Sequence, residues 1–271
     1  MGEITLKILN NSGEKLSGIL HSYTERKLLA IFCHGFLLSK DKPPAREFCE
    51  ELNRAGLNAF RFDFSGYSED YHLGDSEGKF EYSSYTKQAD DLNSVIKYFS
   101  RKNYQIQCVI GHSMGGSVAI LQAALNSGIM HSVIAVAPRI IPANHSIARE
   151  IKEIGKSIDD FIRLEKDPPY YYKGHYPISK RYLEEIRDLR IIDVIGQIKI
   201  PLLLLHGTRD NDVNITEIKM ALEAAHEPKE YIPIPEADHT FSNQKYQYQM
   251  ILSAVAWLKR ALAYNDLSSN R

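Results

Sequence analysis

The chain has 271 residues, a length that one α/β domain with a modest insertion can absorb around a single core. Hydrophobic residues make up 44% and charged residues 25% of the chain, which is typical of a globular protein and excludes a disordered one. The 33 Lys and Arg residues nearly balance the 34 Asp and Glu residues, so the net charge of −1 provides no overall field toward nucleic acid or an anionic membrane and favours a small uncharged ligand.

The chain begins with a pattern that predicts an antiparallel hairpin. Ile4, Leu6 and Ile8 alternate with polar neighbours, turn residues occupy positions 10–13, and a second extended run follows at 16–21. Continuous apolar runs then recur along the chain, as the strands of a parallel sheet buried on both faces require. These predicted strands are residues 28–33, 57–62, 106–110, 133–137, 202–205 and 231–234.

Amphipathic stretches between these runs predict helices. The first opens at Pro43-Pro44, carries Phe48 and Leu52 on one face and ends at Gly56. The others are residues 90–99, 114–126, 217–226 and 247–264. Because strands and helices alternate over most of the chain, the sequence predicts an α/β sandwich.

Residues 139–199 break this alternation. The segment has no convincing strand, is rich in charged residues and contains the run Pro-Pro-Tyr-Tyr-Tyr at 168–172. We expect a small helical cap here, inserted into a core made of residues 1–138 and 200–271. Two roles are open for Tyr170, Tyr171 and Tyr172: lining an aromatic substrate slot, or packing the cap onto the core.

The cysteines and the apolar runs bear on the compartment. Three cysteines cannot all pair, and Cys33 and Cys108 lie within predicted buried strands, which favours a reducing, cytoplasmic location. Charged residues interrupt the first twenty positions, so we expect no signal peptide. No segment reaches the roughly 20 apolar residues that span a bilayer, so we expect no membrane association.

The pattern Gly-x-Ser-x-Gly occurs twice, and context separates the two copies. Residues 111–115 follow a predicted strand and lead into a predicted helix, the strand, turn and helix order in which this pattern presents a nucleophile. Residues 74–78 lie in a loop rich in carboxylates, which would repel a developing oxyanion. Ser113 is therefore the candidate nucleophile.

A serine hydroxyl needs a base, and the base needs an orienting acid. On this strand and helix arrangement the order along the chain is serine, acid, histidine, and both remaining candidates follow predicted strands. His239 is the candidate base and Asp210 the candidate acid, with Asp212 as the alternative acid. Asp238 adjoins His239, and neighbours on an extended segment point apart, so it is poorly placed to orient the ring.

Two backbone amides are candidates for the oxyanion hole. The N–H of Met114 follows the nucleophile, and the N–H of Phe36 lies in the loop after an early strand. We expect His34, His112 and His206, which lie at strand ends, to pack or form hydrogen bonds rather than to catalyse.

Read together, these segments resemble the α/β-hydrolase superfamily, and within it the feruloyl or cinnamoyl esterase-like carboxylesterases. The similar stretches are residues 34–36, 62–66, 75–78, 111–116, 206–210 and 237–241. The resemblance implies an α/β-hydrolase fold with a mostly parallel, eight-stranded sheet flanked by helices, a cap over the acyl pocket, an acyl-enzyme intermediate and no cofactor or metal. Residues 67–73 depart from the family, because they look like an insertion at the pocket mouth.

The sequence therefore predicts a serine hydrolase that cleaves short-acyl or hydroxycinnamoyl-type carboxylic esters of small molecules. Two alternatives remain: a thioesterase or small-peptide hydrolase with the same nucleophile, and a binding protein without catalysis on the same fold. The sequence leaves open whether the protein forms a homodimer.

Overall fold

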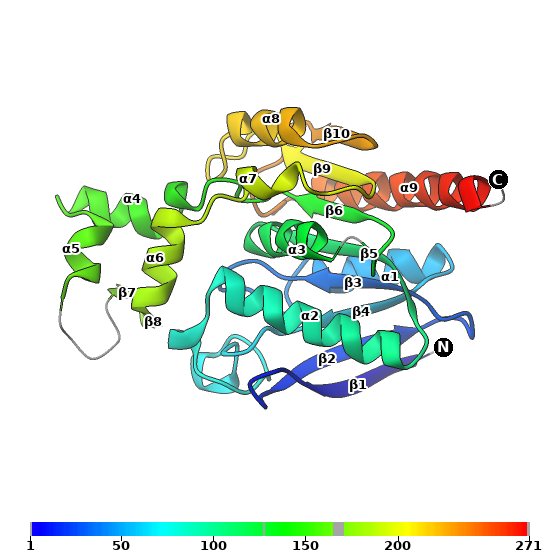
Figure 1. The fold of residues 1–271 in the computed structure, drawn as a ribbon, viewed down its shortest axis with the longest axis horizontal. Helices are drawn as coiled ribbons and strands as arrows, with labels where there is room; N and C mark the ends of the chain where they lie inside the picture. Colours follow the sequence, from blue (N-terminus) through cyan, green and yellow to red (C-terminus); the bar gives the residue numbers. More distant parts are fainter. Residues whose placement is uncertain (1, 127, 165–170, 270–271) are drawn as a thin grey trace.

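The protein is described by a computed structural model that covers residues 2–126, 128–164 and 171–269. Its centre is an eight-stranded sheet with the strand order β1-β2-β4-β3-β5-β6-β9-β10 (Figure 1). The strands are β1 Gly2–Leu9, β2 Lys15–Ser22, β3 Leu28–Cys33, β4 Asn58–Phe62, β5 Gln105–His112, β6 Val133–Val136, β9 Leu202–Gly207 and β10 Lys229–Ile234. The two pairings of β2 are antiparallel and all others in this sheet are parallel, so the predicted mostly parallel sheet is confirmed.

Helices cover both faces of the sheet. The longer helices of the core are α1 Ala45–Arg54, α2 Tyr85–Arg101, α3 Met114–Leu125, α8 Ile215–Ala224 and α9 Gln244–Ser269. Apolar residues of α1 and α9 form one core cluster, and those of α2, α3 and α8 belong to the cluster on the opposite face. Strand β3 shows the alternation that feeds both clusters: Leu29 and Ile31 point to one, Ala30 and Phe32 to the other.

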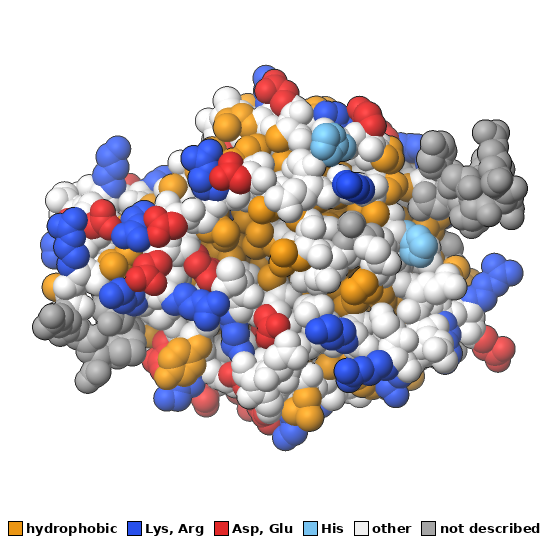
Figure 2. Space-filling view, viewed as in Figure 1, with side chains coloured by type: hydrophobic (Ala, Val, Ile, Leu, Met, Phe, Trp, Pro, Cys, Tyr) orange, Lys and Arg blue, Asp and Glu red, His pale blue; other side chains and the backbone are white. Residues whose placement is uncertain are grey.

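The segment between β6 and β9 extends from one end of the sheet (Figure 1). It contains η3 Pro142–Asn144, α4 Ser146–Glu153, α5 Ile158–Ile162, β7 Tyr171–Lys173, β8 Tyr176–Ile178, α6 Lys180–Asp188 and α7 Ile192–Ile195. Charged side chains are dense over α5 and α6, whereas apolar side chains show between α6 and α3 (Figure 2). The expectation of a segment without strands is wrong, because β7 and β8 pair as an antiparallel hairpin. Strands of three residues are too short to show an alternating pattern in the sequence.

The loop after β4 folds against this hairpin. It holds two short 3₁₀ helices, η1 Glu69–Tyr71 and η2 Phe80–Tyr82. The ring of Phe80 lies 5.4 Å from that of Tyr176 in β8, and Tyr67 is fully buried against His34. The stretch 67–73 is thus anchored to the core at Tyr67, while Glu69, Asp70 and His72 are exposed.

All eight predicted strands are present, and the differences lie at the ends of elements. Helix α2 begins five residues before the predicted start at 90, because the side chain of Ser84 accepts a hydrogen bond from the Lys87 N–H and caps the first turn. Within the described ranges, no helix combines the length and apolar character needed to cross a membrane. Cys33, Cys49 and Cys108 are buried and carry free thiols.

Candidate active site

Ser113 occupies a strained turn between β5 and α3. Its φ of 53° and ψ of −117° lie outside the conformations that residues with a side chain normally adopt. The turn is tight enough that a Cβ on Gly111 would lie 2.1 Å from the carbonyl oxygen of Gly115, and one on Gly115 would lie 2.4 Å from that of Cys33. Both positions therefore require glycine, which is the physical reason for the Gly-x-Ser-x-Gly pattern at this turn.

Three side chains that are distant in the sequence form a hydrogen-bonded chain at the ends of parallel strands. Asp210 follows β9, and His239 lies in the loop after β10. The Oγ of Ser113 is 2.9 Å from Nε2 of His239, and Nδ1 of that ring is 2.8 Å from Oδ2 of Asp210. The structure thus brings together the predicted nucleophile, base and acid.

The side chain of Asp210 is fully buried and receives several hydrogen bonds. Its Oδ1 accepts from the backbone N–H groups of Asp212 and Val213, both at 2.8 Å. Burial opposes its ionisation, but hydrogen bonds from His206 and His239 outweigh burial and hold the pKa of this carboxyl well below its usual range. An ionised carboxylate can only accept, so Nδ1 of His239 carries the proton and Nε2 is free to accept from Ser113.

The two other candidate acids are engaged elsewhere. The Oδ1 of Asp212 accepts a hydrogen bond from Arg149 at 2.8 Å, and the carboxylate of Asp238 binds the backbone N–H and hydroxyl of Ser242. Asp210 is therefore the carboxylate that orients His239 in this structure.

Three histidines at strand ends support the site through hydrogen bonds to groups other than the Ser113 hydroxyl. Nε2 of His112 lies 2.9 Å from the carbonyl oxygen of His239 and fixes the loop that carries that ring. Burial, followed by the charge of His239, lowers the pKa of His112 to about 4, so His112 stays neutral and donates this bond. His206 lies 3.1 Å from the carbonyl oxygen of Val213, and the ring of His34 accepts from the N–H of Phe64 at 3.2 Å.

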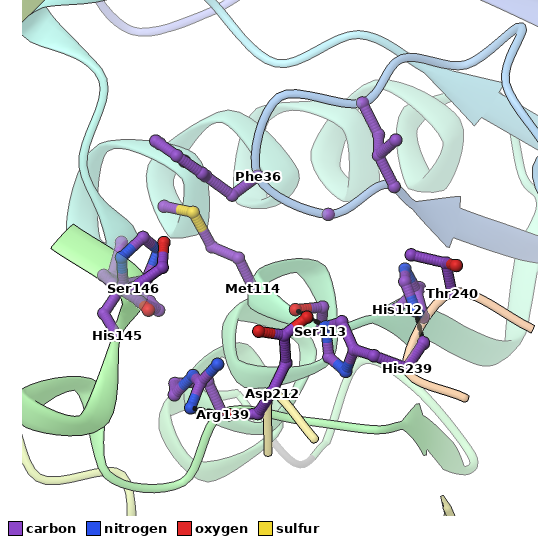
Figure 3. Close-up of a pocket in the computed structure, with 13 residues that line it drawn as sticks. Phe36, His112, Ser113, Met114, Arg139, His145, Ser146, Asp212, His239 and Thr240 are labelled. Atoms are coloured by element: carbon purple, nitrogen blue, oxygen red, sulfur yellow. Dashed lines mark hydrogen bonds between the residues drawn. The ribbon is translucent and has the colours of Figure 1, made fainter. Parts of the chain in front are cut away.

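Phe36 and Met114, the two predicted oxyanion donors, line the same cavity as Ser113 (Figure 3). Within the described chain, neither amide donates a hydrogen bond to another protein group. The loop that carries Phe36 is fastened at its far end, where Lys40 donates from its backbone N–H at 2.7 Å and from Nζ at 2.8 Å to Asp63. Both amides are therefore available to an oxygen atom bound next to Ser113.

The cavity has a volume of about 200 Å³. Its lining residues are Gly35, Phe36, Leu38, Tyr85, His112, Ser113, Met114, Arg139, His145, Ser146, Asp212, His239 and Thr240. Aromatic side chains surround one part of it: the ring of Phe36 stacks on Tyr182 at 5.6 Å and meets the edge of His145 at 4.9 Å. A cavity of about 150 Å³ holds a benzene ring, so this one suits a short acyl chain or a single aromatic ring.

Comparison with known proteins agrees with this geometry. Residues 24–162, just over half of the chain and including Ser113, match the α/β-hydrolase family model described as serine aminopeptidase, S33. The chain belongs to this family. Asp210 and His239 lie beyond the matched residues.

Two relatives share about a quarter of the aligned residues with this chain. The mitochondrial palmitoyl-protein thioesterase ABHD10 of Rattus norvegicus is 24% identical over 189 residues, which cover 68% of this chain but only 59% of the relative. The AB hydrolase superfamily protein YisY of Bacillus subtilis is 24% identical over 263 residues, covering 82% of this chain and 89% of the relative.

Two solved structures show the same fold. Est1E from Butyrivibrio proteoclasticus, solved with ferulic acid, superposes with a TM-score of 0.79 at 22% identity over 95% of this chain and 100% of that one. Mouse ABHD10 superposes with a TM-score of 0.71 at 18% identity over 96% of this chain and 99% of the other. At these identities the likeness establishes the shared fold.

The structure does not place Tyr171 or Tyr172 in the lining of the cavity. Tyr171 packs on Phe161 and its hydroxyl donates to Glu150, while Tyr172 is more than half exposed. Tyr170 lies outside the described residues. These two contacts of Tyr171 lie within the inserted segment, whereas the two predicted roles were lining a substrate slot and packing the segment onto the core.

Several lining residues escaped the sequence analysis. Arg139, His145 and Ser146 come from the start of the inserted segment, and Tyr85 opens α2. No motif marks them, because their places in the cavity wall depend on contacts between elements that are distant in the sequence. Across the described ranges, no group of three or more His, Cys, Asp or Glu side chains is placed to hold a metal ion.

Proposed function

We propose that this chain is a serine hydrolase that cleaves carboxylic esters through an acyl-enzyme intermediate. The observation that carries the proposal is the continuous hydrogen-bonded chain from Ser113 through His239 to Asp210. A serine hydroxyl is a weak nucleophile at neutral pH and needs a base within hydrogen-bonding distance. His239 is at that distance, and Asp210 holds it in the tautomer that can accept the proton.

The proposed reaction follows from the positions of the donors. Ser113 attacks the ester carbonyl while Nε2 of His239 takes its proton, and the amides of Phe36 and Met114 stabilise the oxyanion. The imidazolium then protonates the leaving alcohol. Water, activated by the same ring, hydrolyses the acyl-enzyme and returns the proton to Ser113. Asp210 stabilises the imidazolium in both halves of the reaction.

The cavity limits the substrate class. A volume of about 200 Å³ fits short acyl groups or one ring, in agreement with short-acyl or hydroxycinnamoyl-type esters. We assign residues 139–199 the role of a cap, because His145 and Ser146 close one side of the cavity. A thioesterase is the second candidate, since the chain resembles a palmitoyl-protein thioesterase in sequence. The cavity as it stands is too small for a palmitoyl chain.

A substrate panel tests the proposal. We expect hydrolysis of 4-nitrophenyl acetate and butyrate, weaker turnover of the octanoate, and loss of all turnover in Ser113→Ala with its folding intact. Methyl ferulate reports whether the cavity admits an aromatic acyl group. Hydrolysis of butyryl-CoA without any ester hydrolysis favours the thioesterase. Turnover retained by Ser113→Ala, or no labelling of the native chain by a fluorophosphonate, contradicts the proposal.

A further inference from the structure

Arg139 places a guanidinium group in the wall of the cavity. It follows β6 and is only 4% exposed, and Figure 3 shows it beside Asp212 on the side of the cavity that carries Ser113. Its Nη1 donates to the carbonyl oxygens of Asn144 at 3.1 Å and Asp212 at 2.8 Å. Nη1 therefore holds two loop carbonyl groups in place.

The other two nitrogens of Arg139 have spare donors. Within the described residues, neither Nε nor Nη2 donates to a protein acceptor. The nearest carboxylate, Glu217, lies 3.8 Å from Nη1, beyond hydrogen-bonding distance. Glu217 is occupied by the N–H groups of Ile140 and Ile141 and by the side chain of Asn144. Because neither Nε nor Nη2 is a fully enclosed atom without a partner, water or a ligand in the cavity can reach these donors.

Tyr85 provides a second donor without an acceptor in the same cavity. It is fully buried, and its hydroxyl has no hydrogen-bond partner among the described residues. Burial raises the pKa of Tyr85 well above its usual range, although the charge of Arg139 opposes the rise, so the hydroxyl remains protonated. Two buried side chains with unused donors indicate that the cavity is built for a ligand that carries an acceptor.

We propose that Arg139 determines specificity by binding a carboxylate carried by the substrate of the hydrolase proposed above, with Tyr85 as an additional donor. The adjacent N–H groups on Nε and Nη2 form the planar fork that matches two carboxylate oxygens. The inference rests on the proposed function and narrows it to esters with a second, ionised carboxyl group. It also replaces the expectation of an uncharged ligand, which came from the net charge of the whole chain.

Matched ester pairs test this inference. The first pair is mono-4-nitrophenyl glutarate, which carries the carboxylate on its acyl group, and 4-nitrophenyl pentanoate, which has none. The second pair is 4-carboxyphenyl butyrate, which carries the carboxylate on its alcohol group, and phenyl butyrate, which has none. The measured quantity is kcat/KM for the ester with the carboxylate divided by kcat/KM for its neutral partner. A general effect of a substitution on the chemical step changes both values equally and cancels in this ratio. Arg149→Gln is the control for Arg139→Gln, because Arg149 lies outside the cavity lining and pairs with Asp212. Both variants lose one positive charge.

We expect Arg139→Gln to lower the ratio in at least one pair about tenfold or more relative to Arg149→Gln. A difference of less than about threefold in both pairs overturns the inference, as does an equal loss in the two variants. If Arg139→Gln does not fold, Arg139→Lys keeps the charge without the fork and must still lower the ratio by at least about threefold. Thermal-shift titration of Ser113→Ala with the intact esters measures the preference for the carboxylate-bearing ester in binding, without turnover. Failure of the proposed chemistry is therefore distinguishable from failure of this inference.

Discussion

Replacing Asp210 with asparagine is expected to stop the reaction by reversing one hydrogen bond. In the native chain, Oδ1 accepts from two backbone N–H groups and Oδ2 accepts from His239. The asparagine carbonyl oxygen must take the position of Oδ1, because an NH₂ group there would face two donors. The NH₂ group then faces Nδ1 of His239 and donates to it. This selects the tautomer with its proton on Nε2, which cannot accept from Ser113.

The expected loss is large while the fold is preserved. A base locked in the wrong tautomer lowers kcat by about 10⁴, which corresponds to about 5.4 kcal/mol of activation free energy. Steady-state hydrolysis of 4-nitrophenyl butyrate measures kcat, and circular dichroism checks folding. Asp212→Asn is the control, because that carboxylate contacts Arg149 instead of His239. A kcat for Asp210→Asn within tenfold of the native value would refute the assignment of the orienting acid.

Two further predictions concern stability. Burial opposes the ionisation of Asp210, but hydrogen bonds from His206 and His239 hold its pKa in the folded chain below the usual range. Ionised Asp210 therefore stabilises the fold at pH values above the unfolded pKa of about 3.9. This contribution is lost as the pH falls from there toward the folded pKa. Urea unfolding should therefore show Asp210→Asn losing less stability than the native chain between about pH 5 and pH 3, and parallel losses would contradict this. Gly115→Ala should cost about 1 to 3 kcal/mol of unfolding free energy, since the new Cβ would lie 2.4 Å from the backbone oxygen of Cys33. Gly128→Ala, where a Cβ meets nothing within 4 Å, should change it by less than about 0.5 kcal/mol, and equal effects at the two glycines would argue against the close approach.

The sequence predicted the parts of the site that backbone geometry dictates. Ser113 was recognisable as the candidate nucleophile because a strand that turns sharply into a helix needs glycines on both sides of the residue at the turn, and the structure shows the contacts that exclude a Cβ. Asp210 and His239 were recognisable because loops after parallel strands gather at one edge of the sheet. Their mutual hydrogen bond is present in the structure.

The cavity wall could not be predicted in the same way. Arg139 and His145 carry no motif, and the position of His145 depends on its contacts with Tyr182 of the inserted segment and Phe36 of the core. The tyrosine run drew attention because aromatic residues suit a binding slot, yet Tyr171 faces Phe161. Local sequence patterns indicate helices, strands and turns through the spacing of hydrophobic and turn residues, whereas the lining of a cavity depends on contacts between distant elements.

The attachment of the loop after β3 has a consequence for how this protein can diverge. The ring of Phe36 faces the inserted segment, but the end of its loop is fixed to the core through the buried pair Lys40 and Asp63. Among its described residues, the inserted segment supplies no hydrogen bond or ion pair to Lys40 or Asp63. Changes in residues 139–199 can therefore alter which molecules enter while the backbone amide beside Ser113 keeps its position. For the proposed hydrolase, this means that residues 139–199 can change selectivity by mutation while the parts assigned to bond cleavage stay anchored to the core.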